Sequence, residues 1–395
     1  MSEWKKIRLQ EVVLTANTGL DAIRRAPIVE ENTGVKCLRI QDISQNKNYE
    51  NWGNSTVLSK DLEKAKLLKD DIIMARTCSP GIVYLVKKNL NSVFNNGLAR
   101  IRPKNDLVTS KFLYYLFKSP NFIGHIYGIS TGTSVQLNMK IGDLLSYKFN
   151  LPPLQEQKAI AGVLSSLDDK IDLLHRQNKT LEAMAETLFR QWFIEEAKDD
   201  WEVKTLNDVL TVKGGSTPST SNPIYWNGNI HWTAPRDVTK LTHLHLFDTE
   251  RKITEKGLEK ISSGLLPAGT LLMTSRAPVG VLTFAEIPVA INQGYIAIID
   301  NKGISKEYIF YWLKSNMDYV HSFANGSTFE EISKSAFKSL EFSEPPKVKI
   351  QKFQEFAGPI IEKIKIKTRQ IIEIEKLRDF LLPKLMSGEC KLKDG

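Results

Sequence analysis

The chain has 395 residues, of which 42% are hydrophobic and 25% are charged, and its formal net charge is +9. This composition is typical of a globular protein with two or more buried cores. It excludes a membrane-spanning segment, because no run approaches eighteen apolar residues, and the first residues lack the apolar segment of a signal peptide. The three cysteines are far apart and fit a reduced, cytoplasmic location, and the positive charge favours a polyanionic partner.

Residues 1–150 are predicted to form a first globular domain. Glycine and asparagine separate short runs of β-forming residues in this stretch, as turns between strands require. These runs lie at 37–40, 71–75, 82–86 and 98–101. Residues 111–118 have the apolar spacing of one short amphipathic helix. We therefore expect a β-rich domain that also contains helix.

Residues 151–198 are predicted to form a long central helix. From Ile160 to Trp192, apolar residues recur at alternating intervals of four and three, which is the heptad seam of a helix that pairs with another helix. At about 1.5 Å per residue, this seam is roughly 50 Å long. The one polar residue in it is Asn178. A buried amide in such a seam costs stability but fixes register and partner.

Residues 346–395 repeat this helix, because adding 193 to each seam number gives a second seam from Phe353 to Leu385. Its two polar members are Lys367 and Arg378. The pairing partner of the central helix is therefore expected within the same chain.

Residues 199–345 repeat the plan of the first domain. The matches include Trp201–Leu206 with Trp4–Leu9, Arg236–Val238 with Gln41–Ile43, and Asn292–Gly294 with Asn95–Gly97. The sequence therefore predicts an α+β fold with a pseudo-two-fold internal repeat. Two similar β-rich α/β domains are separated by two long antiparallel coiled-coil helices, and the order of the segments favours one domain at each end of the pair.

No catalytic, metal or cofactor site is expected. The phosphate-binding pattern G-x-x-x-x-G-K-[ST] does not occur. Gly214–Pro218 is rich in glycine but lacks the lysine, so we interpret it as a turn. His243 and His245 have no evident third metal ligand, and we interpret them as loop residues.

Polar residues suited to reading DNA occur at matching places in both domains. Sequence-specific reading of a duplex requires Arg, Asn, Gln, Ser or Thr at base edges, supported by phosphate contacts. The candidates in the first domain are Arg39, Gln41, Arg76, Thr77, Asn95, Asn96, Thr131, Thr133, Ser134, Gln136 and Asn138. Those in the second domain are Arg236, Ser275, Arg276, Asn292, Gln293, Ser327 and Thr328. The alternative for the arginines is a surface salt bridge, and for the others it is an ordinary turn.

The whole chain, from residue 1 to about 390, resembles the specificity subunits of type I restriction–modification systems. The residues that carry the resemblance are Leu151–Gln157 at the entry of the first helix and Leu382–Glu389 at the end of the second. The framework from Asp71–Ile73 to Gly81 and the turn Gly132–Ser134 add to it.

The resemblance implies a non-catalytic subunit that binds double-stranded DNA together with two methyltransferase (modification) subunits and, in the full complex, restriction subunits. The methyltransferase subunits supply S-adenosylmethionine and adenine methylation. Each domain then reads half of a split target, and the helices set the spacing. Lys367 and Arg378 depart from an apolar seam, and we interpret them either as side chains that reach the edge of the helix pair or as contacts to another subunit.

Two other functions remain open from the residues themselves. The first is a stand-alone sequence-specific DNA-binding regulator. The second is an enzyme, either a methyltransferase or a nuclease, and the absence of catalytic motifs argues against it. Tight binding of DNA by the lone chain distinguishes the regulator, and transfer of a labelled methyl group distinguishes the enzyme.

Overall fold

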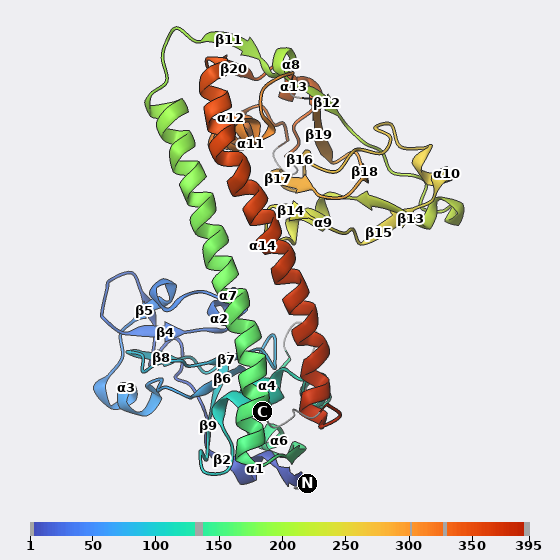
Figure 1. Cartoon of the computed structure of the whole chain (residues 1–395). Coiled ribbons are helices and arrows are strands. Elements are labelled where there is room, and N and C mark those ends of the chain that lie inside the picture. The colour runs from blue at the N-terminus through green and yellow to red at the C-terminus, as the bar shows by residue number, and fades with distance from the viewer. Residues whose placement is uncertain (1–3, 131–136, 301, 327–329, 391–395) are drawn as a thin grey trace. The chain divides into compact units, whose positions relative to one another are not determined.

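The computed structural model of this chain describes residues 4–130, 137–300, 302–326 and 330–390. The chain divides into two compact units, one formed by residues 1–171 with 373–395 and the other by residues 172–372. Each unit contains one globular domain and part of two long helices (Figure 1). The units cut across the linear boundaries expected from the sequence, because each domain shares a hydrophobic core with both helices.

The first domain is closed by pairing of its ends, since β1 (Lys5–Arg8) is antiparallel to β10 (Lys148–Leu151). Its two other sheets have the strand orders β2-β9-β6-β7 and β3-β5-β4-β8. The strands are β2 (Val13–Thr18), β3 (Ile28–Val29), β4 (Lys36–Leu38), β5 (Gly53–Ser55), β6 (Ile72–Ala75), β7 (Val83–Leu85), β8 (Ser92–Phe94) and β9 (Leu98–Pro103). The helices are α1 (Leu9–Val12), α2 (Ile40–Ser44), α3 (Ser59–Ala65), α4 (Ser110–Lys118), α5 (Pro120–Ile129) and α6 (Ile141–Leu145), with a 3-10 turn η1 (Tyr49–Asn51).

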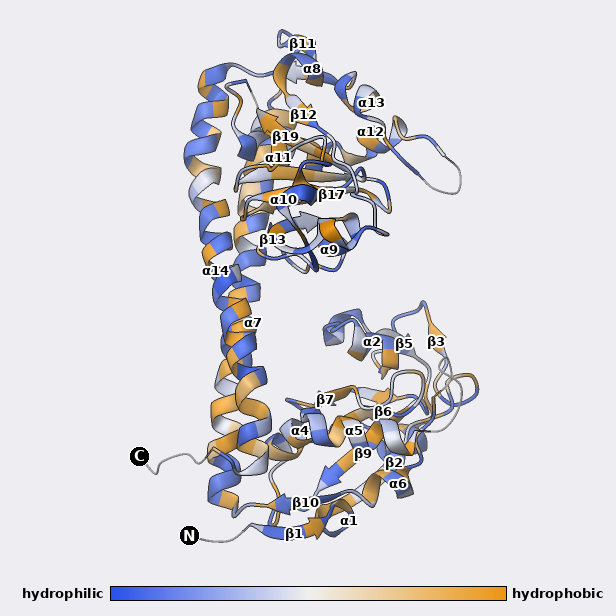
Figure 2. Cartoon of the chain, turned by 90° about the vertical axis from the view of Figure 1, so that its right-hand side faces the viewer, coloured by the Kyte–Doolittle hydropathy of each residue, from blue (hydrophilic) through white to orange (hydrophobic). Residues whose placement is uncertain are grey.

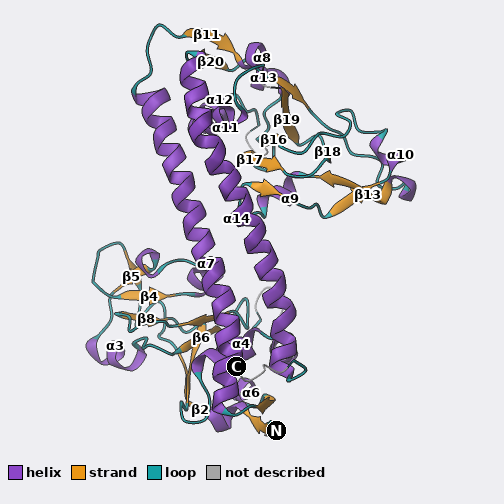
Figure 3. Cartoon of the chain, in the orientation of Figure 1, coloured by secondary structure: helices purple, strands orange, loops and turns teal. Residues whose placement is uncertain are grey.

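The second domain repeats this plan (Figure 3). β11 (Glu202–Thr205) is antiparallel to β20 (Glu341–Glu344), and the other sheets have the orders β12-β19-β16-β17-β14 and β15-β13-β18. The strands are β12 (Thr211–Lys213), β13 (Trp226–Thr233), β14 (His245–Leu246), β15 (Arg251–Ile253), β16 (Thr270–Ser275), β17 (Val279–Ala285), β18 (Val289–Ile291) and β19 (Tyr295–Asp300). The helices are α8 (Leu206–Val209), α9 (Pro235–Thr239), α10 (Glu255–Leu258), α11 (Lys306–Ser315), α12 (Met317–Ser322) and α13 (Lys334–Lys338), with η3 (Pro223–Tyr225). The predicted internal repeat is confirmed, down to the parallel pairing of β4 with β8 and of β13 with β18.

The strands and the helix expected in the first domain correspond to observed elements, with one difference. The run predicted at 37–40 is only partly a strand, because β4 ends at Leu38 and α2 begins at Ile40. The carboxylate of Asp42 accepts a hydrogen bond from the backbone N–H of Arg39 at 3.0 Å, so this side chain caps the helix where the strand was expected to continue.

Two long helices pair antiparallel within each unit. They are α7 (Leu154–Arg190), which continues as a π turn over Gln191–Glu195, and α14 (Lys347–Ser387). Two contacts between these helices lie in the second unit. The ring of Phe193 lies 5.4 Å from that of Phe353, and Asn178 Nδ2 donates to Thr368 Oγ1 at 3.3 Å. Figure 2 shows hydrophobic residues recurring along both helices. None of the predicted seam positions is exposed.

The polar seam positions have partners within the chain. Lys367 Nζ donates to Gln177 Oε1 in the second unit. In the first unit, Arg378 Nη1 contacts Asp168 Oδ1 at 2.9 Å, and the same carboxylate accepts a hydrogen bond from Tyr115 Oη at 2.8 Å. The sequence predicted that Lys367 and Arg378 either reach the edge of the helix pair or contact another subunit, and neither prediction included these partners within the chain. The spacing along one helix does not show which polar residue of the other helix faces it.

The entry to α7 is fixed by a fully buried amide. Gln157 Oε1 accepts from the N–H of Thr109 at 2.9 Å, and Nε2 donates to the carbonyl oxygens of Leu107 at 3.0 Å and Pro152 at 2.8 Å. The amide therefore satisfies three backbone groups and attaches the start of α7 to the loop before α4. The shift of 193 places Ile350 at this position in the second unit, where packing replaces the hydrogen bonds.

We expect Gln157→Ile to lower the free energy of unfolding by about 3 kcal/mol, because each buried backbone group left without a partner costs roughly 1–3 kcal/mol. Chemical denaturation of the full chain measures this loss. Gln155→Ile is the matched control, since Gln155 is exposed two residues before Gln157 in the same first turn of α7. Equal effects of the two substitutions would show that helix propensity, not the buried amide, determines the result.

Candidate nucleic-acid interface

Many of the first domain's candidate residues meet in one group of loops, which we call the first loop cluster and define as residues 18–20, 39–42, 76–78, 95–97 and 137–139. Backbone hydrogen bonds join the loops. The N–H of Asn96 donates to the carbonyl of Leu20 at 2.8 Å, and that of Arg76 donates to the carbonyl of Gly97 at 3.0 Å. The N–H of Met139 donates to the carbonyl of Arg76 at 2.8 Å. Residues far apart in the sequence thus share one surface.

The second domain builds the same frame from residues 214–216, 234–237, 275–277, 292–294 and 330–332, the second loop cluster. The N–H of Ser275 donates to the carbonyl of Gly294 at 2.8 Å, and the N–H of Ile332 donates to the carbonyl of Ser275 at 3.0 Å. Each bond has its counterpart in the first cluster. One backbone arrangement therefore occurs twice, each time within its own unit.

A glycine in each cluster allows two backbone segments to touch. A Cβ atom on Gly19 would lie 2.2 Å from the carbonyl oxygen of Phe94, and one on Gly215 would lie 1.8 Å from that of Ile291. No larger residue fits at either position. The interpretation of Gly214–Pro218 as only a turn is therefore incomplete, and Gly19 is not among the residues predicted from the sequence. The sequence did contain a signal for these contacts. Gly19 and Gly215 occupy corresponding positions of the two repeats, and each precedes the matched Asn-x-Gly turn of its repeat.

Arg76, which follows β6, and Arg276, which follows β16, do not occupy equivalent positions of the two domains. The backbone bonds align Arg76 with Ser275 and Thr77 with Arg276. The Arg76 guanidinium donates to the carbonyl oxygens of Met139 at 3.3 Å and Asn96 at 3.1 Å, and to Asn138 Oδ1 at 3.1 Å, so it ties three loops together. Arg276 instead forms an ion pair with Glu331 at 3.7 Å near the surface.

The remaining candidates differ in exposure. Gln41, Asn96, Asn138, Arg236 and Gln293 are exposed, and the Arg236 side chain is 72% exposed. Arg39, Thr77, Asn95 and Asn292 are half-buried, and Ser275 is buried. Arg39 pairs with Asp42 at 3.2 Å, and Asn292 Oδ1 accepts from the N–H of Gly294 at 2.8 Å, so both have structural contacts. Thr131, Thr133, Ser134, Gln136, Ser327 and Thr328 lie outside the described residues.

A buried tyrosine supports the second loop cluster. Tyr295 Oη donates to the carbonyl of Ala234 at 2.8 Å and lies 3.0 Å from Thr233 Oγ1. Burial raises the pKa of Tyr295 far above its usual value, so the hydroxyl keeps its proton. The N–H of Ala234 also donates to Asp237 Oδ2 at 2.8 Å. These bonds hold the start of α9, from which Arg236 extends into solvent.

The interpretation of His245 as a loop residue is wrong. It lies in β14, is fully buried, and its Nδ1 is 2.8 Å from Glu286 Oε1. Burial alone raises the pKa of Glu286, but the hydrogen bond from His245 and the charge of Lys365 lower it overall. Burial and the neighbouring His245 lower the pKa of His243. Throughout the described ranges, no group of three His, Cys, Asp or Glu residues is placed to hold a metal ion.

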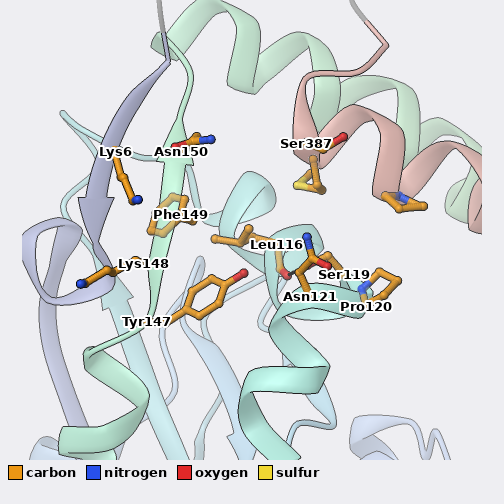
Figure 4. Close-up of a pocket in the computed structure, with 12 residues that line it drawn as sticks. Lys6, Leu116, Ser119, Pro120, Asn121, Tyr147, Lys148, Phe149, Asn150 and Ser387 are labelled. Atoms are coloured by element: carbon orange, nitrogen blue, oxygen red, sulfur yellow. Dashed lines mark hydrogen bonds between the residues drawn. The ribbon is translucent and has the colours of Figure 1, made fainter. Parts of the chain in front are cut away.

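A cavity of about 290 Å³ lies in the first unit, between β1, β10, the start of α5 and the end of α14 (Figure 4). Tyr147 and Met386 are among its lining residues, and none of the described candidates is. The shift of 193 places Phe193 at the position of Met386, and in the second unit its ring packs 4.8 Å from that of Tyr308. We therefore interpret the cavity as a packing difference between the repeats. Of the helices in the described part of the chain, none has both the length and the apolar character to cross a membrane.

Comparisons with known proteins agree with this architecture. The family model described as the type I restriction modification DNA specificity domain matches twice, over residues 1–183 and 198–376. The MjaIX specificity subunit of Methanocaldococcus jannaschii is 36% identical over 194 residues, which are 49% of this chain and 45% of that protein. The HindI specificity subunit of Haemophilus influenzae is 23% identical over 98% of this chain and 100% of its own length.

A solved structure shares the fold. The crystal structure of the type I restriction–modification S subunit from M. genitalium has a TM-score of 0.63 and 18% identity, and the match covers 97% of this chain and 96% of that one. The duplicated loop clusters and the paired helices thus occur in a chain whose two halves both match one family model. This chain belongs to the type I restriction modification DNA specificity domain family.

Proposed function

We propose that this chain is the DNA sequence-specificity subunit of a type I restriction–modification complex, in which each globular domain reads one half of a bipartite target. The observation that supports this most directly is one backbone frame built twice with different exposed side chains. Gln41 of the first loop cluster corresponds to Arg236 of the second, and Asn96 corresponds to Gln293. Domains that share a frame and differ at exposed polar positions are suited to reading different bases.

The charge and the helices support the same proposal. A net charge of +9 favours contact with phosphates, which supplies affinity that does not depend on sequence. The helix pair sets the length of the unread spacer between the half-sites. Its polar contacts, Asp168 with Arg378 and Asn178 with Thr368, fix the register of the seam in each unit.

The complex that we propose contains two methyltransferase subunits, docked on the helices and their flanks, and restriction subunits where cleavage takes place. The methyltransferase subunits supply S-adenosylmethionine and methylate adenine. The chain itself is non-catalytic and works in the cytoplasm. Family membership supports this assignment, as does the lack of a phosphate-binding or metal-binding motif in the sequence.

We expect the chain with its methyltransferase partner to methylate one bipartite sequence, and the chain alone to methylate nothing. Mapping of adenine methylation in host DNA, with and without the gene for this chain, tests the proposal. Methylation of a contiguous motif would contradict it. Tight, specific binding of DNA by the lone chain in a gel-shift experiment would instead favour a regulator, and methyl transfer by the lone chain would favour an enzyme.

We expect insertion of one heptad in both helices to lengthen the spacer and to leave both half-sites unchanged. The insertions go between Asp168 and Gln177 in α7 and between Lys367 and Arg378 in α14. Seven residues preserve the phase of the seam and add about 10 Å. The measurement is the spacer length in the methylated motif. An insertion in α7 alone is the control, because it puts the two seams out of register. An unchanged spacer in the double insertion would contradict the proposal that the helix pair sets the spacer length.

Arg76→Ala and Arg276→Ala are expected to act in different ways. Arg76 ties three loops, so its loss should lower both the thermal stability of the chain and all recognition of one half-site. Arg276→Ala should leave stability unchanged and lower methylation of the other half-site about tenfold or more. Methylation rates on a library of targets separate base contacts from phosphate contacts. A uniform loss across sequences for Arg276→Ala would identify a phosphate contact.

A further inference from the structure

Thr217 stands at the tip of a loop whose two sides are fixed by tryptophans. Trp232 Nε1 donates to the carbonyl of Ser216 at 3.2 Å, and Trp226 Nε1 donates to the carbonyl of Ser219 at 3.0 Å. Thr217 is exposed between these two anchored positions. The loop therefore presents this side chain from a rigid support, which is the usual requirement for a contact that discriminates between ligands.

The base of the loop is fixed as well. Gly215 rests against the carbonyl of Ile291, and the N–H of Ser216 donates to the same oxygen at 3.1 Å. Ser216 Oγ donates to the carbonyl of Lys260 at 2.8 Å, and Pro218 is buried. Since Ile291 ends β18 two residues before Gln293, the loop and the Asn-Gln-Gly turn are held together.

The hydroxyl of Thr217 donates to Gln293 Oε1 at 2.7 Å, and both side chains are exposed. A glutamine amide has one acceptor and two N–H donors. The Thr217 hydroxyl uses one of the two lone pairs of Oε1 and fixes which way the amide faces, so both N–H donors of Nε2 remain for a partner. A glutamine that reads adenine uses both ends of its amide, whereas a fixed donor end selects an acceptor such as purine N7, guanine O6 or thymine O4.

We propose that Thr217 is a positioning residue that orients the amide of Gln293, so that this side chain donates to an acceptor on a base edge of the second half-site. The inference rests on the proposed function and assigns a role to a residue that sequence reasoning treated as part of a turn. It applies to one base pair of the half-site that the second domain reads.

The first loop cluster has no counterpart of the hydrogen bond between Thr217 and Gln293 among its described residues. Asp21 takes the place of Thr217, but its Oδ1 accepts from the N–H groups of Ile23 at 3.0 Å and Arg24 at 2.7 Å. These hydrogen bonds, that of Arg24 first, lower the pKa of Asp21, so it remains a carboxylate that holds its own turn. In the described structure, the side chain of Asn96 has no hydrogen-bond partner. The two domains thus differ in whether the corresponding amide is fixed.

The test uses the full chain with its methyltransferase partner and a library of DNA targets. Thr217→Val keeps the shape and removes the hydroxyl. We expect discrimination at one base pair of the second half-site to fall about tenfold, with the first half-site and the melting temperature unchanged. Thr217→Ser restores the hydroxyl and should restore discrimination. Thr242→Val is the matched control, because Thr242 is an exposed threonine of the same domain that lies outside both the second loop cluster and the long helices.

Three results would overturn the inference. They are unchanged discrimination in Thr217→Val, a uniform loss over all sequences of the second half-site, and failure of Thr217→Ser to restore the wild-type pattern. The failure of the proposed function has a different signature, because the wild-type chain itself would then direct no bipartite methylation.

Discussion

The rest of the structure depends on the pairing of α7 with α14 through apolar seams that are also part of the domain cores. In the second unit, Phe189 and Phe353 lie 5.5 Å apart and belong to the same buried cluster as Tyr308 of α11. In the first unit, Leu164 and Leu385 share a cluster with the first domain. The helices are therefore not free rods, since each domain completes its core only when both helices are in place.

Directional contacts add orientation to this non-directional burial. In the first unit, Asp168 of α7 receives Tyr115 from α4 and Arg378 from α14. In the second unit, Lys365 of α14 lies 3.6 Å from Glu286 at the end of β17, and Glu286 in turn contacts His245. Hydrophobic burial is roughly proportional to area and permits sliding, whereas hydrogen-bonded charges permit few geometries. Each domain is thereby fixed on its own part of the helix pair.

The loop clusters separate the frame from the side chains that it presents. Their joining bonds run between backbone groups and at glycines, so exposed residues change without disturbing the frame. The second domain can therefore carry Arg236 at the position of Gln41, and Gln293 at the position of Asn96, on the same backbone arrangement. Arg76 is the exception, because its guanidinium is itself part of the frame of the first cluster.

The sequence by itself determined the duplication, the two heptad seams and the order of domain and helix, because hydrophobic periodicity and repetition are written along the chain. It also indicated the loops that carry polar residues. Only the tertiary structure decided the partners of Lys367 and Arg378, the contacts by which the Arg76 guanidinium joins three loops, and the hydrogen bond between Thr217 and Gln293. Each of these depends on contacts between residues far apart in the sequence, and a one-dimensional pattern holds no information about which polar groups meet.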